Sequence, residues 1–223
     1  MNTHTLGMLS LNIAFVLYLF VFIPQIWHNR RLEYLQNLSP VMHAVLYVGV
    51  LFDLFYGFAN DFQWQYKTVS IVSLLVLSVQ HIQLLRLFHQ RVQWRMLAMN
   101  TFMVFVMLGC IGYFFVGIHH ELAPISALVV GYASRVCYQL YAIPQIVKNI
   151  KLKDANAVSR YFLLINTTLL VLDTISGWCL DWGWPAKLSP PISLIMMSIL
   201  LYQRKYFCTA MKASPTFRST VEN

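Results

Sequence analysis

Charged side chains are scarce in this sequence: they make up 11% of its 223 residues, and only 8 are Asp or Glu. Soluble globular domains carry about 25% charged residues, so this composition excludes an ordinary water-exposed surface. Hydrophobic residues make up 58%, and the mean hydropathy is +0.60. Apolar windows of about 20 residues are typical of transmembrane helices. Seven such windows are present: Leu6–Trp27, Val41–Ala59, Thr68–Phe88, Leu97–Ile118, Pro124–Val147, Tyr161–Leu180 and Leu188–Phe207. We therefore expect an all-α membrane protein with seven transmembrane helices.

Cysteine is also rare, and no two cysteines stand close together. The four residues lie at positions 110, 137, 179 and 208 without any C-x-x-C spacing, so neither a disulfide framework nor a metal site is indicated. No window contains a nucleophile–base pair, an H-x-x-x-H helix or a phosphate-binding loop. An enzyme is therefore the weakest of the possible functions, and we expect neither a cofactor nor a metal.

Acidic residues are outnumbered by basic ones, giving a formal net charge of +8. If seven helices cross the membrane, thirteen Lys and Arg residues fall in loops 28–40, 86–96 and 148–160 and in the C-terminal tail, whereas only Lys67 and Lys187 fall on the other side. This asymmetry predicts an N-terminus outside and a C-terminus in the cytoplasm. It assigns the basic excess to topology and membrane lipid, and argues against nucleic acid as a partner.

The sequence contains an internal repeat with an offset of 120 residues. The most distinctive matches pair Ile23–Ile26 with Ile143–Ile146 and Asp53 with Asp173. Identities continue on both sides of these, and they include Tyr18/Tyr138, Asn29/Asn149, Ser39/Ser159, Gly57/Gly177, Trp64/Trp184, Lys67/Lys187 and Gln83/Gln203. We interpret the chain as two parallel three-helix repeats, residues 5–90 and 124–207, joined by a linking helix at 97–118 and followed by a cytoplasmic tail at 208–223. Parallel repeats of this kind are a transporter architecture with a binding site between the repeats near the membrane midplane.

Each repeat carries one Pro-Gln pair near the predicted cytoplasmic end of its first helix, Pro24-Gln25 and Pro144-Gln145. A proline inside a helix removes a backbone hydrogen bond, and polar side chains can satisfy the freed carbonyl in a membrane. We expect these four residues to form a hinge or gate. The alternative is that both prolines simply end their helices at the interface.

These paired motifs resemble the PQ-loop family, which includes cystinosin, the lysosomal cationic amino-acid exporters and, more distantly, the SWEET carriers. The segment "LFDLFYGFANDFQWQYKTVSI" is similar to the second helix of the cationic amino-acid exporters, and "LLVLDTISG" resembles the sixth helix of cystinosin. The resemblance implies transport of a small solute by alternating access. It also implies that Asp173 couples transport to a proton, with its repeat mate Asp53 as the second candidate.

Three ionisable residues fall inside the predicted spans: Asp53, Arg135 and Asp173. Charge within a membrane usually faces a cavity or a partner and marks function, although a structural ion pair is the alternative. Arg135 could bind a substrate carboxylate, or it could neutralise either aspartate. By helical spacing, Asn166 is a candidate substrate-binding residue beside Asp173, and Tyr132 and Gln139 are candidates beside Arg135. Tyr138 is a further candidate because it and its repeat mate Tyr18 both stand shortly before a Pro-Gln pair.

Taken together, these features predict a carrier that moves an amino acid or a similar small solute together with a proton. The family resemblance favours a cationic amino acid or cystine as the substrate. The alternatives are a sugar carrier of the SWEET type and a non-transporting seven-span receptor. The expected partners are the substrate, protons and membrane lipid. The sequence does not decide between a bacterial inner membrane and a eukaryotic endolysosomal membrane.

Overall fold

The computed structural model describes residues 2–90 and 124–213, together with the isolated residues 98, 102, 105 and 109. Within these ranges every regular element is an α-helix. The linking helix expected at 97–118 lies almost entirely outside the described residues, as does the tail from residue 214 onward.

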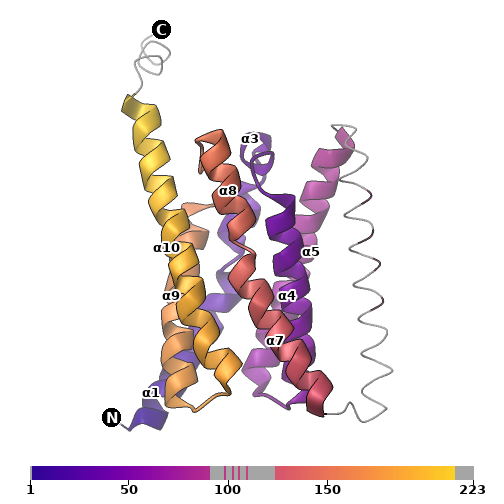
Figure 1. Ribbon diagram of the computed structural model, residues 1–223, viewed down its shortest axis with the longest axis vertical. Helices are drawn as coiled ribbons and strands as arrows, with labels where there is room; N and C mark the ends of the chain where they lie inside the picture. Colours follow the sequence, from indigo (N-terminus) through magenta and orange to yellow (C-terminus); the bar gives the residue numbers. More distant parts are fainter. Residues whose placement is uncertain are drawn as a thin grey trace.

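The helices form an elongated bundle whose axes run roughly parallel (Figure 1). The first half consists of α1 (Thr3–Phe20), α2 (Ile23–His28), α3 (Leu32–Leu35), α4 (Pro40–Ala59) and α5 (Trp64–Gln90). The second half consists of α7 (Pro124–Leu140), α8 (Ile143–Leu152), α9 (Arg160–Cys179) and α10 (Trp184–Ala213). The start of α1 and the end of α10 lie at opposite ends of the bundle (Figure 1). The helix α10 continues past the predicted window end at Phe207.

Four segments of the described chain are long and apolar enough to cross a membrane: Thr3–His28, Pro40–Ala59, Trp64–His89 and Arg160–Cys179. They coincide with four of the seven windows expected from the sequence. The α7–α8 segment and α10 are not among the four, and both carry polar residues within their apolar runs, including Arg135, Ser189 and Ser193. The fold is therefore an all-helical membrane bundle, and the number and direction of the crossings remain predictions.

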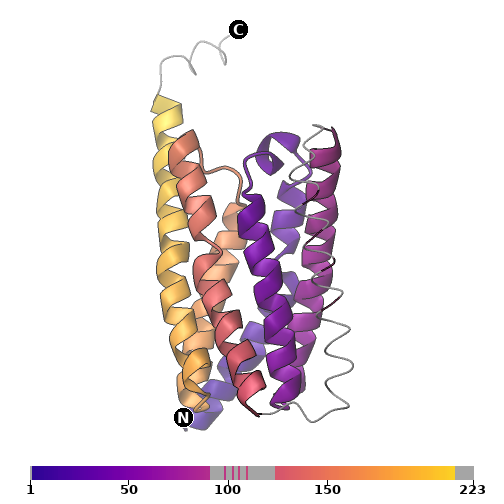
Figure 2. The same cartoon turned by 45° about the vertical axis from the view of Figure 1, so that its right-hand side comes forward.

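The helices of each half are not packed in chain order. In the first half α5 contacts both α1 and α4, and in the second half α10 contacts both α7 and α9. The two halves meet through α4 against α7 and through α1 against α9, so the first helix of each half packs on the second long helix of the other. Figure 2 shows α4 and α7 side by side along this junction.

Small residues allow α4 and α7 to approach closely. A Cβ atom added to Gly131 would lie 2.6 Å from the ring of Tyr56, and one added to Gly49 would lie 2.9 Å from the Cβ of Cys137. Real Cβ atoms essentially never make such short contacts. Close packing of helix backbones through small residues is a common means of helix association in membranes.

Each half has a short break in its first long helix. The break falls at Val21–Phe22 in the first half and at Tyr141–Ala142 in the second, and the next helix begins with the Ile-Pro pair of the motif. Proline is tolerated in the first turn of a helix because the amide it lacks would have no partner there. The two prolines thus start new helices just beyond a turn, at equivalent points of the two repeats.

The turns at the opposite end of the bundle are also equivalent. Asp61 and Asp181 both adopt left-handed backbone conformations, with φ of 46° and 51°. Each carboxylate accepts a hydrogen bond from a lysine of the following helix, Lys67 or Lys187, and this bond lowers the pKa of both aspartates. Both aspartates are fully exposed, so these pairs fix the turns locally.

Candidate functional site

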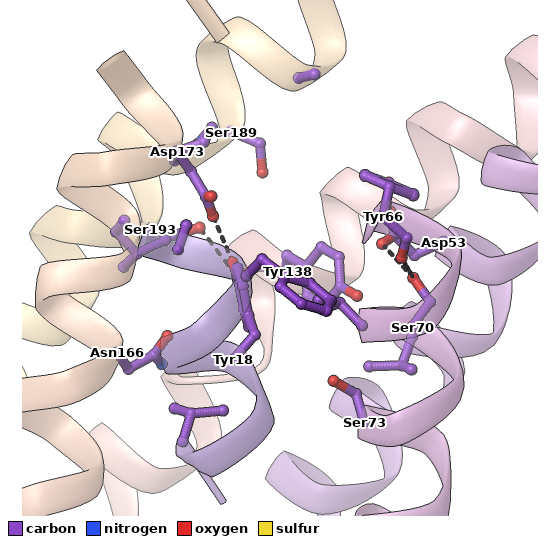
Figure 3. A pocket seen from close by; sticks show the side chains of 18 of the residues that line it. Tyr18, Asp53, Tyr66, Ser70, Ser73, Tyr138, Asn166, Asp173, Ser189 and Ser193 are labelled. Carbon is purple, nitrogen blue, oxygen red and sulfur yellow. Dashed lines mark hydrogen bonds between the residues drawn. The ribbon is translucent and has the colours of Figure 1, made fainter. Parts of the chain in front are cut away.

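A cavity of about 150 Å³ lies between the two halves, and all six long helices contribute to its wall. Since a water needs about 10–15 Å³, a space of this size holds on the order of ten waters, or a small solute. Apolar atoms form most of the lining surface. The lining residues that carry polar side-chain atoms are Tyr18, Asp53, Gln65, Tyr66, Ser70, Ser73, Arg135, Tyr138, Tyr141, Asn166, Asp173, Trp182, Ser189 and Ser193. Figure 3 shows Asp53 and Asp173 on opposite sides of this space, with Tyr18 and Tyr138 between them.

Asp53 forms an ion pair with Arg135 across the α4–α7 junction. Arg135 Nη2 lies 3.1 Å from Asp53 Oδ1, and both side chains are largely buried. The same carboxylate accepts hydrogen bonds from the hydroxyls of Tyr66, Ser70 and Ser134. Arg135 Nη2 also donates to the Tyr66 hydroxyl at 2.7 Å. Asp53 is therefore a compensated charge, and the ion pair joins the two repeats.

Asp173 has a much simpler environment. It accepts a hydrogen bond from the hydroxyl of Tyr18 on α1, and it makes no salt bridge with any described residue. A carboxylate that lines a cavity without a cation beside it is well suited to bind a proton or a cationic group. The two repeat-related aspartates thus differ in the charge they face.

The difference follows from residues that the duplication does not share. With the offset of 120, the counterparts of Arg135 and Ser134 are Phe15 and Ala14, and those of Tyr66 and Ser70 are Ala186 and Pro190. Every partner of Asp53 is consequently replaced by an apolar residue around Asp173. The sequence left open which aspartate Arg135 neutralises, and the structure assigns it to Asp53.

Two polar atoms in the cavity wall are buried without a hydrogen-bond partner among the described residues: Arg135 Nε and Gln65 Oε1. Buried polar groups are usually paired, and an unpaired one calls for an explanation such as a water, an ion or a ligand. One atom is a donor and the other an acceptor. The cavity wall therefore holds one unpaired donor and one unpaired acceptor among the described residues, and neighbouring atoms cover both of them.

The other candidate substrate-binding residues are placed as follows. Asn166 and Tyr138 line the cavity, and Asn166 donates to the Tyr141 hydroxyl at 3.0 Å. Tyr138 packs beside Arg135, whose guanidinium carbon is 5.8 Å from the ring centre. Tyr132 and Gln139 do not line the cavity, and Tyr132 is half exposed on the outside of α7.

Sequence reasoning missed several residues that shape the site. Tyr66 and Ser70 were not selected, although their spacing of four places them on one face of a helix. No comparable sequence pattern pointed to Ser134 or Gln65, which are neutral polar residues next to Arg135 and Tyr66. The described residues contain no group of three or more His, Cys, Asp or Glu that could hold a metal ion.

The two glutamines of the Pro-Gln pairs reach across to the opposite half. Gln25 Oε1 accepts from the backbone amide of Ser159 at 2.8 Å, and its Nε2 donates to the carbonyl of Ala157 at 3.1 Å. Gln145 makes the equivalent bonds to Ser39 and Asn37, at 2.7 and 3.2 Å. Both glutamines are almost fully buried. Each half therefore supplies the polar partner for the start of a helix in the other, rather than for its own proline break.

Comparisons with known proteins were made for both sequence and structure. The family model described as PQ loop repeat matches twice, at residues 6–66 and 127–186. No curated protein sequence matches the chain significantly. Among solved structures, the chain resembles one described as a eukaryotic SWEET transporter, with a TM-score of 0.67 and 11% sequence identity. That match covers 93% of this chain and 99% of the other. At 11% identity the similarity shows a shared fold and nothing beyond it.

Proposed function

Since the chain belongs to the PQ-loop repeat family and has the fold of a multi-pass membrane transporter, we propose that it carries an amino acid across the membrane together with a proton. The observation that supports this most directly is the difference between the two aspartates of the central cavity. Asp53 is held by Arg135, whereas Asp173 faces the same space without a salt bridge to any described residue.

The cavity suits a solute that carries both an acidic and a basic group. The free Nε of Arg135 can donate to a substrate carboxylate, because the guanidinium fork has donors left after binding Asp53. Asp173 takes up the coupled proton, and Gln65 Oε1 can accept a hydrogen bond from the substrate ammonium group. Within this class, a cationic amino acid and cystine are the first candidates, because the segments around Asp53 and Asp173 resemble those of the cationic amino-acid exporters and cystinosin.

Proton coupling follows from the protonation of Asp173. When Asp173 is ionised, it accepts a hydrogen bond from the Tyr18 hydroxyl and forms no salt bridge with a described residue. A proton neutralises this charge and removes the cost of exposing it to the apolar lining. The loaded and neutralised carrier can then change conformation, and the direction of the proton gradient determines the direction of net transport.

The conformational change takes place where Gln25 and Gln145 form hydrogen bonds to the opposite half. The four hydrogen bonds of Gln25 and Gln145 join the two halves at the end that carries the motif. The positive-inside pattern predicts that this end faces the cytoplasm, so we expect these bonds to close the carrier on its cytoplasmic side. Opening it requires both pairs to separate, and the helix breaks before Pro24 and Pro144 are the natural hinges.

The proposal is tested by reconstituting the protein in liposomes and measuring uptake of labelled arginine, lysine and cystine. With one proton per solute, a gradient of one pH unit supports about tenfold accumulation. We expect Asp173→Asn to abolish accumulation while exchange of labelled for unlabelled solute persists. Asp181→Asn is the matched control, since it makes the same change in the same half at an exposed turn.

Equal accumulation by wild type and Asp173→Asn would refute the role of Asp173. A sugar is the second candidate substrate, because the hydroxyls of Ser73 and Ser193 and the amide of Asn166 also line the cavity. Uptake of labelled glucose or sucrose without any effect of pH would establish that function instead. Binding without uptake of any solute would favour a receptor.

A further inference from the structure

A pair of histidines is buried between α4 and α5, away from the central carboxylates. His43 is 2% exposed and His81 is 5% exposed, and His43 Nε2 lies 3.2 Å from His81 Nδ1. The two rings stack with centres 5.4 Å apart. With the offset of 120, their counterparts in the second half are Leu163 and Leu201. The repeat therefore shows that apolar residues fill this position equally well, so packing alone does not account for the histidines.

Each histidine has one ring nitrogen that is buried without a partner among the described residues: Nδ1 of His43 and Nε2 of His81. A neutral imidazole carries a hydrogen on one nitrogen only. If His43 donates across the pair, its own Nδ1 is a free acceptor and His81 Nε2 is a free donor. If His81 donates, the two roles exchange. In both neutral arrangements the pair has a proton acceptor at one end and a proton donor at the other.

Nothing charged faces this pair within the described part of the chain. From α4, Tyr47 presents its ring edge to both imidazoles, and its hydroxyl is bonded to Ser78. The side chains that the Val21–Phe22 break, α2 and α9 bring to the His43 side are Phe22, Gln25 and Phe162, none of which titrates. A structural role as an ion-pair partner is therefore excluded for these histidines among the described residues.

The space beside His43 limits what it can bind. This second cavity is about 10 Å³ and includes Gln25 and Gln80 in its wall. A volume of about 10–15 Å³ accommodates one water, so an organic solute does not fit. The described residues also provide no third His, Cys, Asp or Glu to complete a metal site. A proton, carried by one water or by the rings themselves, is the ligand that matches these dimensions.

The small cavity adjoins the central one. Phe22, Leu46 and Phe162 line both spaces, and the rings of Phe22 and Phe162 have centres 5.7 Å apart. We call these three side chains the apolar partition. His43 and Gln25 lie on the far side of this partition from Asp173. A proton leaving the central cavity toward the end that carries the Pro-Gln pairs meets His43 next.

We propose that His43 and His81 form a proton-transfer pair that passes the coupled proton between the apolar partition and the motif end of the bundle. One nitrogen end accepts a proton, the hydrogen of the shared N–H···N bond shifts to the other ring, and a proton leaves from the opposite end. Both rings are then neutral again, with their tautomers exchanged. This inference rests on the proposed proton-coupled transport, which it extends by a second proton site.

The first test does not depend on transport. The full-length protein, labelled with ¹⁵N-histidine in lipid nanodiscs, is studied by NMR, and the two rings are assigned from His43→Leu and His81→Leu. We expect a nitrogen–nitrogen coupling across the shared hydrogen bond and shifts averaged over both tautomers. One fixed tautomer throughout roughly pH 5 to pH 8 would overturn the proposal.

The second test uses liposomes and the double variant His43→Leu/His81→Leu, which reproduces the leucines of the other half. We expect exchange of the labelled amino acid to persist, which shows that the variant is folded, and gradient-driven accumulation to fall from about tenfold to none. His89→Leu, an exposed histidine of the same helix, is the control. Undiminished accumulation in the double variant refutes the pair. Absence of accumulation in the wild type refutes proton coupling itself, and the NMR result then decides the pair alone.

Discussion

The ion pair between Asp53 and Arg135 allows a quantitative prediction about how the two repeats are held together. Removing one member of a buried pair costs about 3–5 kcal/mol, because the other charge is left uncompensated. The partners that remain determine where in this range each variant falls. After Arg135→Met, Asp53 keeps three hydroxyl donors from Tyr66, Ser70 and Ser134, so we expect a loss of about 3 kcal/mol.

Asp53→Leu is expected to be the more damaging change. Arg135 then keeps only the Tyr66 hydroxyl among its described hydrogen bonds, and its Nε already lacks a partner. A buried guanidinium with so few acceptors should cost about 5 kcal/mol, the upper end of the range. The double variant removes both charges, so its loss should be smaller than the sum of the single losses by about 2 kcal/mol or more.

The assay is unfolding of the purified protein in detergent, followed with a thiol-reactive dye. Cys137 and Cys179 are free and half-buried at the junctions between the halves, so they become reactive as the halves separate. Two results would refute the reasoning: additive losses in the double variant, or a larger loss for Arg135→Met than for Asp53→Leu. The former would mean that the two charges do not interact energetically.

Three further predictions concern other contacts that hold the helix bundle together. Gln25→Ala and Gln145→Ala should each leave a buried backbone amide and a buried backbone carbonyl unpaired, at a cost of about 1–3 kcal/mol per group. Both should also open the cavity from the motif end, measured as faster labelling by a water-soluble thiol reagent of a cysteine introduced at the cavity residue Ser73. Gly131→Ala should destabilise the α4–α7 contact by about 1–3 kcal/mol through overpacking, measured by the same unfolding assay, whereas an unchanged midpoint would show that the helices can move apart freely. The bond from Lys187 lowers the pKa of Asp181, so any stabilisation by that pair is present at neutral pH and is lost as the pH falls below the usual carboxylate range. Because Asp181 is fully exposed, Asp181→Asn should leave the unfolding midpoint at neutral pH unchanged.

The positions of the helices and the division into two halves were largely predictable from the sequence, because they depend on local properties. Apolar length located the helices, and the offset of 120 identified the two halves and their equivalent breaks. The neighbours of each helix were not predictable in this way. Whether Arg135 meets Asp53 or Asp173 depends on α7 packing against α4, and that is a tertiary contact for which a single sequence carries no periodic signal.

The choice of substrate-binding residues shows the same limit on a smaller scale. Spacing by three and four placed Tyr132 and Gln139 on the same helical face as Arg135, and α7 is indeed helical over these residues. The side of α7 that borders the cavity is instead centred between Arg135 and Tyr138, so residues one turn away on either flank point elsewhere. A helical face spans about 100°, and its exact orientation is set by packing.

The reciprocal hydrogen bonds of Gln25 and Gln145 have a consequence for how such a chain could arise. Gln25 binds the loop of the second half in the same way that Gln145 binds the loop of the first, which is the rule of an isologous contact in a two-fold symmetric dimer. A single half could therefore pair with its own copy through this contact. In such a dimer every substitution appears twice. Fusion into one chain allows Arg135 to occupy one junction only, and allows His43 and His81 to occur in one half while leucines fill the other.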